Sequence, residues 1–214
     1  MKILLFGATG MIGSRIAAEV LRRGHEITAA TRSGKAPGLD DAKAAVVSAD
    51  VSDAGKVAEL ATGHDAVVSA IAPPRDGSEP SGPLLAAYRA LIEGLRSSGV
   101  RRVVVVGGAG SLQVAPGQAL VDSPGFPDAY KGEALAHREV LTLFRGVDDL
   151  DWTYLSPAAE IAPGERTGVF RTGGDQLLAD AEGHSRISAE DYAVALVDEV
   201  EKGEAVHRRI TVAY

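Results

Sequence analysis

The sequence predicts an α/β protein of the Rossmann type, in which a doubly wound parallel sheet carries helices on both faces. Three observations support this fold class. Short apolar runs alternate with amphipathic segments of helical period along most of the chain. The run at 103–106 is apolar without a break, as in strands buried on both faces. The first apolar run leads into three glycines, Gly7, Gly10 and Gly13, and a helical pattern follows them.

In the first half, each expected strand is a short apolar run and each expected helix closes at a glycine. The first helix carries Ile12, Ile16 and Val20 on one face. Ser52 or Asp53 is placed to cap the second helix. The expected strands occupy 3–6, 26–30, 44–48 and 65–70, and the expected helices run from 12 to Gly24 and from the 52–53 cap through Leu60 to Gly63.

The second half begins with a loop rich in Pro and Gly and ends with a capped helix and an alternating strand. Ser188 and Asp191 have the spacing of a capping box, which opens the last helix. We expect residues 157–188 to form a small appendage of substrate-side loops within the single domain 1–214. The remaining expected elements are a loop at 73–83, helices from 84 to Gly99, from 130 to 144 and from 188 to 201, strands at 102–106, 152–155 and 207–213, and an irregular stretch at 107–128.

Length and composition exclude several classes of protein. The 214 residues carry a net charge of −7, without the basic footprint of a nucleic-acid-binding domain. The absence of cysteine excludes disulfides and thiolate chemistry, and the five histidines show no paired metal-ligand spacing. No apolar run approaches the roughly 20 residues that span a bilayer, and the first strand leaves no room for a signal peptide. We therefore expect a cytoplasmic protein that binds no metal, membrane or nucleic acid, as a monomer or a dimer.

The glycine-rich turn indicates a dinucleotide cofactor. In this motif the first glycine permits a tight turn, the second lets the backbone approach a pyrophosphate, and the third lets the helix pack against the strand. Free N–H groups and the positive end of the helix dipole then face the anion. The spacing of Gly7, Gly10 and Gly13 is GxxGxxG, which resembles the variant of extended and atypical short-chain dehydrogenase/reductases. The alternative is a plain strand–helix connection.

Residues after the second strand favour NADP(H) over NAD(H). An NAD site usually has Asp or Glu there, whereas this chain has Arg32 and Ser33, with Lys35 close behind. A guanidinium binds a 2′-phosphate bidentately and stacks on adenine, and the alternative is a solvated arginine on a loop. Two further strand ends are expected along the cofactor, each with the alternative of a simple turn: Asp50 and Val51 near adenine, and Ala70, Ile71 and Ala72 along the ribose and nicotinamide.

The chain lacks the Tyr-x-x-x-Lys pair with which short-chain reductases move a proton during carbonyl reduction. Tyr130 stands at the expected place, but the fourth residue after it is Ala134, and Lys131 is only its neighbour in sequence. This absence argues against a sugar epimerase and against a typical ketoreductase. Hydride transfer to a flavin needs less from the protein, because the ring delocalises the charge and has mainly to be held face to face with the nicotinamide.

Four phrases of the second half, together with the glycine turn, carry a family resemblance. The phrases are Val106-Gly-Gly-Ala-Gly-Ser-Leu112, Asp151-Trp-Thr-Tyr-Leu-Ser-Pro-Ala-Ala159, Pro163-Gly-Glu-Arg-Thr-Gly168 and Arg186-Ile-Ser-Ala-Glu-Asp-Tyr-Ala193. With them the chain resembles, over essentially its whole length, the bacterial NADH-flavin reductase family, in the NAD(P)-binding, NmrA-like branch of atypical short-chain reductases. It is also similar in plan to biliverdin reductase B, which reduces flavins with NADPH.

The resemblance implies which residues contact each part of the cofactor. The pyrophosphate would lie against Gly7, Thr9, Gly10, Met11 and Ile12, and the 2′-phosphate against Arg32 and Ser33. The nicotinamide would be flanked by Gly107, Gly108, Ala109, Ser111, Pro157 and Ala158. Ser111 lies near the place of the catalytic serine of reductases, where its hydroxyl would bond the carboxamide or the substrate. The alternative is a serine that satisfies its own loop.

Further side chains are candidates for the acceptor side. Tyr130 is a candidate catalytic group and is also placed to stack on a planar substrate. Arg166 either binds an anionic substrate group or pairs with Glu165 or Glu160. Trp152 begins a strand, and burial statistics favour a core position over a flavin platform.

These observations lead to the hypothesis of an NAD(P)H-dependent reductase whose acceptor is a flavin, such as FMN or FAD, or a similar planar quinonoid ring. Solvent or Ser111 would supply any proton. The rival hypothesis is a non-catalytic nucleotide sensor that reports redox state to a protein partner, as NmrA-like proteins do. An epimerase or dehydratase is a third alternative, which the missing Tyr–Lys pair disfavours.

Overall fold

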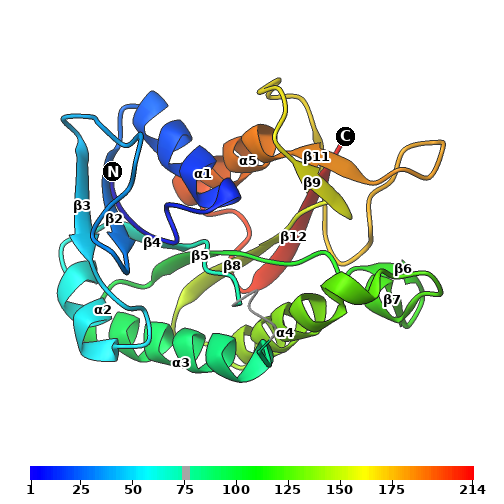
Figure 1. Ribbon diagram of the computed structural model, residues 1–214, viewed down its shortest axis with the longest axis horizontal. Helices are drawn as coiled ribbons and strands as arrows, with labels where there is room; N and C mark the ends of the chain where they lie inside the picture. Colours follow the sequence, from blue (N-terminus) through cyan, green and yellow to red (C-terminus); the bar gives the residue numbers. More distant parts are fainter. Residues whose placement is uncertain (74–77) are drawn as a thin grey trace.

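The computed structural model describes residues 1–73 and 78–214, which form an eight-stranded, mostly parallel sheet with helices on both faces (Figure 1). The strand order is β10-β12-β8-β5-β4-β1-β2-β3, and all neighbours are parallel except β10 and β12. The Rossmann-type fold predicted from the sequence is therefore confirmed. The strands are β1 (Lys2–Phe6), β2 (Glu26–Thr31), β3 (Ala44–Ser48), β4 (Ala66–Ser69), β5 (Arg102–Val106), β8 (Asp151–Ser156), β10 (Arg171–Gly173) and β12 (Arg208–Ala213).

The helices form two layers, one on each side of the sheet (Figure 1). α1 (Met11–Arg22) and α5 (Ala189–Lys202) pack together on one face. On the other face, α3 (Ser81–Ser98) lies between α2 (Ala54–Ala61) and α4 (Asp128–Arg145). The sheet is thus doubly wound, as the alternating pattern of the sequence predicts.

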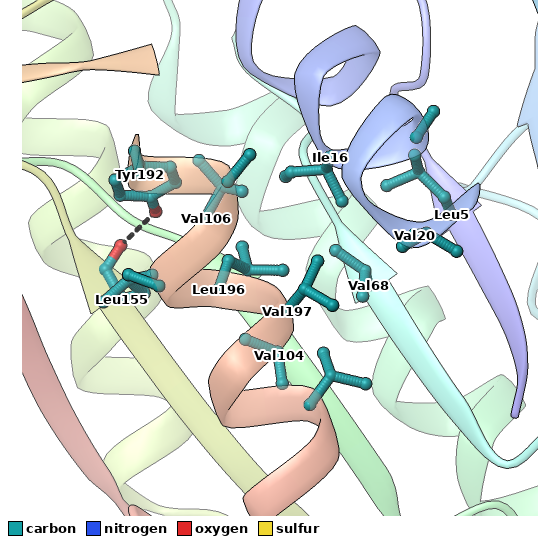
Figure 2. Packing of buried hydrophobic residues seen from close by; sticks show 14 of the residues in the cluster. Leu5, Ile16, Val20, Val68, Val104, Val106, Leu155, Tyr192, Leu196 and Val197 are labelled. Carbon is teal, nitrogen blue, oxygen red and sulfur yellow. Dashed lines mark hydrogen bonds between the residues drawn. The ribbon is translucent and has the colours of Figure 1, made fainter. Parts of the chain in front are cut away.

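Two buried apolar clusters fill the space between these layers because successive strand residues point to opposite faces. Figure 2 shows the cluster beneath α1 and α5, where Ile16 and Leu196 approach side chains of the central strands such as Val104. The other cluster lies under α2, α3 and α4, and its aromatic members include Phe144 and Trp152, whose ring centroids are 5.9 Å apart. Trp152 is 2% exposed and donates its ring N–H to the carbonyl of Val147. The prediction that this tryptophan belongs to the core is confirmed.

Several short strands were not visible in the sequence pattern. The stretch 107–128, expected to be irregular, contains the hairpin β6 (Gln113–Ala115) and β7 (Gln118–Ala119), followed by the 3-10 helix η1 (Leu120–Asp122). Two or three residues are too few for a periodic pattern to emerge. The expected loop at 73–83 is shorter than predicted because α3 already begins at Ser81, and its residues 74–77 lie outside the described part of the chain.

The prediction that 157–188 consists of loops is wrong in part. β9 (Glu160–Ala162) and β11 (Arg186–Ser188) pair as a small parallel sheet beside α5, and β10 extends the main sheet as an antiparallel edge strand. Gly173 of β10 lies opposite Thr211 of β12. The appendage is therefore built partly into the central sheet.

The last helix begins as the sequence predicts, but its cap is not reciprocal. Ser188 accepts a hydrogen bond from the backbone N–H of Asp191 at 3.0 Å. The buried Asp191 carboxylate does not return to Ser188 and accepts instead from the Thr167 hydroxyl and the Gly168 N–H, at 2.6 and 2.7 Å. The first turn of α5 thereby fixes the loop 163–168.

Arg166, on this same loop, pairs with neither Glu165 nor Glu160, so that part of the sequence prediction is wrong. Its guanidinium makes two 2.7 Å hydrogen bonds to the carboxylate of Glu19 on α1, whose side chain is 3% exposed. Arg23 donates to the same carboxylate at 2.8 Å. Hydrogen bonding to Arg166 is the largest cause of a lowered pKa at Glu19, followed by opposing desolvation and by the bond from Arg23.

Replacing Arg166 by Met should weaken this attachment in a pH-dependent way. Because the folded-state pKa of Glu19 lies below its ordinary value of 4.5, the ion pair stabilises the fold above that value. This contribution is lost as the pH falls through the folded pKa. We expect Arg166→Met to lower the free energy of unfolding by about 1 kcal/mol at about pH 7, and by progressively less toward about pH 3, as measured by urea denaturation.

Arg22→Met is the matched control for this measurement. Arg22 faces the same carboxylate at 3.4 Å, but its side chain is 62% exposed. We expect its replacement to change the free energy of unfolding by less than about 0.5 kcal/mol. An equal loss of stability in Arg166→Met at both pH values would contradict a role for ionised Glu19.

Candidate functional site

The candidate site lies at the carboxyl edge of the sheet, where the order of strands reverses between β1 and β4. Ligands of doubly wound sheets bind in the crevice at such a switch point. The fold brings to this edge the six segments that the sequence assigns to the cofactor, although direct contact of each with a cofactor stays a prediction. The segments are 7–13 after β1, 32–33 after β2, 50–51 after β3, 70–72 after β4, 107–111 after β5 and 157–158 after β8.

Two glycines of the turn are required by the packing of the protein itself. Gly7 has a φ of +85°, and a Cβ there would lie 2.4 Å from the carbonyl oxygen of Ala70. A Cβ on Gly13 would lie 2.0 Å from the carbonyl oxygen of Gly7. These contacts bring β1, α1 and the end of β4 together at the switch point.

Gly10 differs from both, because little in the protein limits its side chain. Its backbone is extended, with φ −73° and ψ 167°, and a Cβ would have one ordinary contact, 3.5 Å from the Gly7 oxygen. Gly10 is also the N-cap of α1, and that end has no side-chain cap and no acidic residue in its first turn. The first N–H groups of a helix have no partner within it and attract anions. This open position fits the pyrophosphate of a dinucleotide.

The remaining residues of the turn surround that position. Thr9 is exposed, and Met11 is 40% exposed at the first position of the helix. Ile12 is half-buried and packs against the core beneath α1. Thr9 and Met11 therefore remain accessible to a ligand at the rim, whereas Ile12 helps to hold the helix on the sheet.

The end of β2 presents a fixed backbone with a solvent-exposed cation. The Ser48 hydroxyl donates to the carbonyl of Arg32 at 3.2 Å, and the Thr31 hydroxyl bonds to Lys35 across the turn. Arg32 and Ser33 are both exposed. Within the described residues, the Arg32 guanidinium forms no ion pair, so its five donors are available to a ligand.

Asp50, at the end of β3, shares this region with Arg32. One oxygen of its carboxylate accepts from the backbone N–H and the hydroxyl of Ser52, at 2.9 and 2.7 Å. These two bonds, with a smaller contribution from the charge of Arg32, lower the pKa of Asp50. The neighbouring Val51 is half-buried against the core. The arrangement leaves a carboxylate oxygen and an arginine on the side of the site predicted for adenine.

After β4, Ala70 and Ile71 are half-buried and Ala72 is exposed. The backbone of the first two lies directly against Gly7. Beneath them the hydroxyl of the fully buried Ser69 donates a hydrogen bond to the hydroxyl of the fully buried Tyr88 at 3.3 Å. This strand end therefore forms a rigid, uncharged wall along the predicted path of the cofactor.

The ends of β5 and β8 are tied together by their own polar groups. The carbonyl of Leu155 accepts from the Gly107 N–H at 2.8 Å and from the Tyr192 hydroxyl at 2.6 Å, the latter drawn in Figure 2. Gly108 donates its N–H to the Tyr154 hydroxyl at 3.2 Å. These N–H groups are therefore committed within the protein, and this part of the site is shaped by packing more than by free donors.

Packing also explains why residues 107 and 108 are glycine. A Cβ on Gly107 would lie 2.0 Å from the ring of Tyr154, and one on Gly108 would lie 3.0 Å from the Cβ of His137. On the adjoining strand end, Pro157 and Ala158 are both buried. Ala109 remains half-exposed at the surface of this wall.

The buried tyrosines were missed by sequence reasoning and act as anchors. Burial raises the pKa of Tyr88, Tyr154 and Tyr192, so each keeps its proton and holds a fixed hydrogen bond. The predicted candidate Tyr130 lies in the first turn of α4 and is 62% exposed, with Lys131 exposed beside it. No buried Tyr–Lys pair therefore lines this edge within the described part of the chain.

Ser111 is half-buried and has a partner that the sequence did not suggest. Its Oγ accepts a 2.8 Å hydrogen bond from Nη1 of Arg209, which lies on β12 and is 6% exposed. Arg209 is also paired with Asp175. A cation inside an otherwise alternating strand pattern was the available signal, but its partner lies 98 residues away.

Two further properties bear on the class of site. The described residues contain no group of three or more His, Asp or Glu side chains arranged to hold a metal ion. Among the described helices, none has the length and apolar character needed to cross a membrane.

Comparison with known proteins identifies the family. Residues 7–202 match the NAD(P)H-binding family, which extends from the first glycine of the turn to the end of the last helix. The chain belongs to this family. A nicotinamide cofactor is therefore assigned to the protein, in agreement with the open position at Gly10.

Three solved structures resemble the whole chain. A protein of Burkholderia pseudomallei, described as a "putative exported protein", is 53% identical with a TM-score of 0.89 over all of both chains. A "putative epimerase" of Bacteroides thetaiotaomicron is 39% identical, with a TM-score of 0.91 over all of this chain and 96% of that one. A "putative NADH-flavin reductase" of Streptococcus pneumoniae TIGR4 is 33% identical, with a TM-score of 0.83 over all of this chain and 99% of that one. The cytoplasmic location expected from the sequence stays a prediction.

The different roles of Gly10 and Gly13 can be separated by the same substitution. Gly10→Ala should leave the free energy of unfolding within about 0.5 kcal/mol of wild type, because its Cβ fits the backbone and its surroundings. It should raise the Kd for NADPH at least about tenfold, because the methyl group would occupy the place of a phosphate. Fluorescence titration of NADPH and urea denaturation measure the two effects.

Gly13→Ala is the matched control, and we expect it to destabilise the fold, which Gly10→Ala should not do. Its Cβ meets the Gly7 oxygen at 2.0 Å, so we expect a loss of about 1–3 kcal/mol in the free energy of unfolding. Unchanged NADPH binding in a stable Gly10→Ala protein would rule out a pyrophosphate at this position.

Proposed function

We propose that this protein is an NAD(P)H-dependent reductase whose acceptor is a flavin or a similar planar quinonoid ring. The observation that carries the proposal is an open pyrophosphate position in a site whose described residues include no Tyr-x-x-x-Lys pair. When bound, the reduced nicotinamide would supply a hydride, that is, one proton together with two electrons, to the acceptor ring. A flavin or quinone spreads the resulting negative charge over its ring, so the protein needs to provide little acid–base chemistry.

The work left to the protein is to position two rings and to exclude other geometries. The Gly107–Gly108 wall supports this task because it is fixed by Tyr154 and Tyr192. Ser111, at the far end of the same loop, is the candidate to donate a hydrogen bond to the acceptor, with solvent as the final source of protons. Tyr130 is exposed and suits stacking against a planar ring at the rim.

NADPH is proposed as the preferred cofactor. Arg32 follows β2, where NAD-dependent proteins usually carry an acid, and its guanidinium has no ion pair within the described residues. Ser33 is exposed beside it and adds a hydroxyl donor. A fixed backbone and a free planar cation suit bidentate binding of a 2′-phosphate.

The solved relative described as an NADH-flavin reductase supports the proposed acceptor class, and the one described as an epimerase supports a different one. Epimerases of the short-chain class rely on a Tyr-x-x-x-Lys pair, and no tyrosine of this chain has lysine at the fourth position. The second candidate function is a non-catalytic redox sensor, which the same missing pair also favours. Catalytic turnover distinguishes reductase from sensor.

The test is to mix the purified protein with NADPH and FMN and to follow the loss of nicotinamide absorbance. We expect oxidation of NADPH well above the rate without protein, with FMN or with a soluble quinone as acceptor. FMN fluorescence lost on reduction provides a second record of the same step. Tight NADPH binding without turnover across flavins and quinones would refute the reductase and favour the sensor.

Arg32→Ala tests the choice of cofactor independently of the acceptor. We expect the Kd for NADPH to rise about tenfold or more, because a charge-assisted bidentate contact is lost, while the Kd for NADH changes by less than about twofold. Lys56→Ala is the control, since Lys56 is a surface lysine engaged with Glu59. Unchanged NADPH affinity in Arg32→Ala would refute the 2′-phosphate assignment.

A further inference from the structure

Arg209 is a buried cation directly beneath the loop that follows β5. Its guanidinium uses each of its nitrogens: Nη1 donates to Ser111 Oγ at 2.8 Å, and Nε donates to a carboxylate oxygen of Asp175 at 2.8 Å. Nη2 contacts the same Asp175 oxygen and also the Asp175 carbonyl. Because the guanidinium is planar, the two bonds to Asp175 fix the direction in which Nη1 points.

The chemistry of this contact determines how the Ser111 hydroxyl is oriented. A guanidinium has donors only and does not lose its proton in proteins, so Ser111 Oγ must be the acceptor. The hydroxyl proton therefore points away from Arg209. Within the described residues Ser111 has no acceptor for that proton, and its side chain is half-buried at the carboxyl edge of the sheet. The proton is thus available to a ligand.

The backbone on both sides of Ser111 is held by hydrogen bonds in which Arg209 takes no part. The flanking Leu112 donates its N–H to the Ala109 carbonyl at 2.9 Å and is fully buried. On the other side, the carbonyl of Gly110 accepts from the Val121 N–H at 2.9 Å. The guanidinium therefore acts on the hydroxyl of Ser111, while other contacts hold the loop.

We propose that Arg209, held by Asp175, is a positioning residue that turns the Ser111 hydroxyl outward as a hydrogen-bond donor to the acceptor ring. A nearby positive charge also strengthens a hydroxyl as a donor, most of all when negative charge develops on the atom it bonds. The inference rests on the proposed function, because it assigns the acceptor of that reaction as the partner of Ser111.

The test compares Ser111→Ala, Arg209→Lys and the double variant. Lysine keeps the charge but lacks the planar fork, so it does not bond Asp175 and Ser111 in the same geometry. We expect each single variant to lower kcat for FMN reduction about tenfold and to raise the Kd for FMN in the complex with NADP⁺ by a similar factor. The Kd for NADPH should change by less than twofold. The double variant should be no worse than Ser111→Ala alone, because Arg209 acts through that hydroxyl.

Two further variants serve as a control and as an alternative to Arg209→Lys. Arg145→Gln is the matched control, because Arg145 contacts the same Asp175 carboxylate at 3.3 Å and does not contact Ser111. It should match wild type in both measurements. Asp175→Asn keeps Arg209 and weakens only the contact between its guanidinium and residue 175. If Arg209→Lys does not fold, as judged by thermal unfolding, Asp175→Asn should still lower FMN affinity and kcat in the same direction, about threefold.

The outcomes separate this inference from the proposed function. If wild type reduces FMN but the effects of Ser111→Ala and Arg209→Lys multiply to about a hundredfold, the positioning role is overturned and the reductase stands. Wild-type values in Arg209→Lys, or in Asp175→Asn where the lysine variant fails to fold, would also overturn it. Another outcome is that wild type binds FMN without reducing it. If the double variant then binds FMN no more weakly than Ser111→Ala alone, the positioning role stands and the reductase is refuted. If wild type neither binds nor reduces FMN, both are overturned.

Discussion

The close contact between the Gly7 carbonyl and Gly13 sets the distance between β1 and α1, and much of the molecule follows from it. With no side chain at residue 13, the helix lies directly on the strand and buries Ile16 and Val20 against the sheet. The same approach carries the start of α1 to the point where the strand order reverses. The apolar packing of one layer and the place of the predicted anion-binding helix end thus depend on one backbone contact.

The two halves of the candidate site use their backbone polar groups differently. At α1 the N–H groups of the first turn have no side-chain cap and face the position beside Gly10. At β5 the corresponding groups of residues 107 and 108 are occupied by Leu155 and Tyr154. The start of α1 is therefore suited to bind the negative charge of any dinucleotide, whereas the end of β5 provides a surface of fixed shape. Discrimination among acceptors would then come from the loops around Ser111 and Tyr130.

The sequence predicted what is local and missed what is distant. The glycine turn, the alternation of strands and helices and the Ser188 cap each lie within a few residues, where spacing determines geometry. The bond from Arg166 to Glu19 joins residues 147 apart, and that from Arg209 to Ser111 joins residues 98 apart. No periodic pattern records such pairs, because they form only when separate elements pack. The short strand β10 was missed for a different reason, since three residues carry too little pattern.

The antiparallel direction of β10 also has an electrostatic consequence. Gly173 lies opposite Thr211, and in an antiparallel pair two steps forward on one strand correspond to two steps back on the other. β10 ends at Gly173, and the chain continues from there in the direction of Arg209 on β12, where the Asp175 carboxylate meets the buried guanidinium. A parallel edge strand would have carried the acid away from this cation. The antiparallel direction of the chain at the sheet edge therefore places the carboxylate of Asp175 beside Arg209. This negative charge compensates the buried guanidinium.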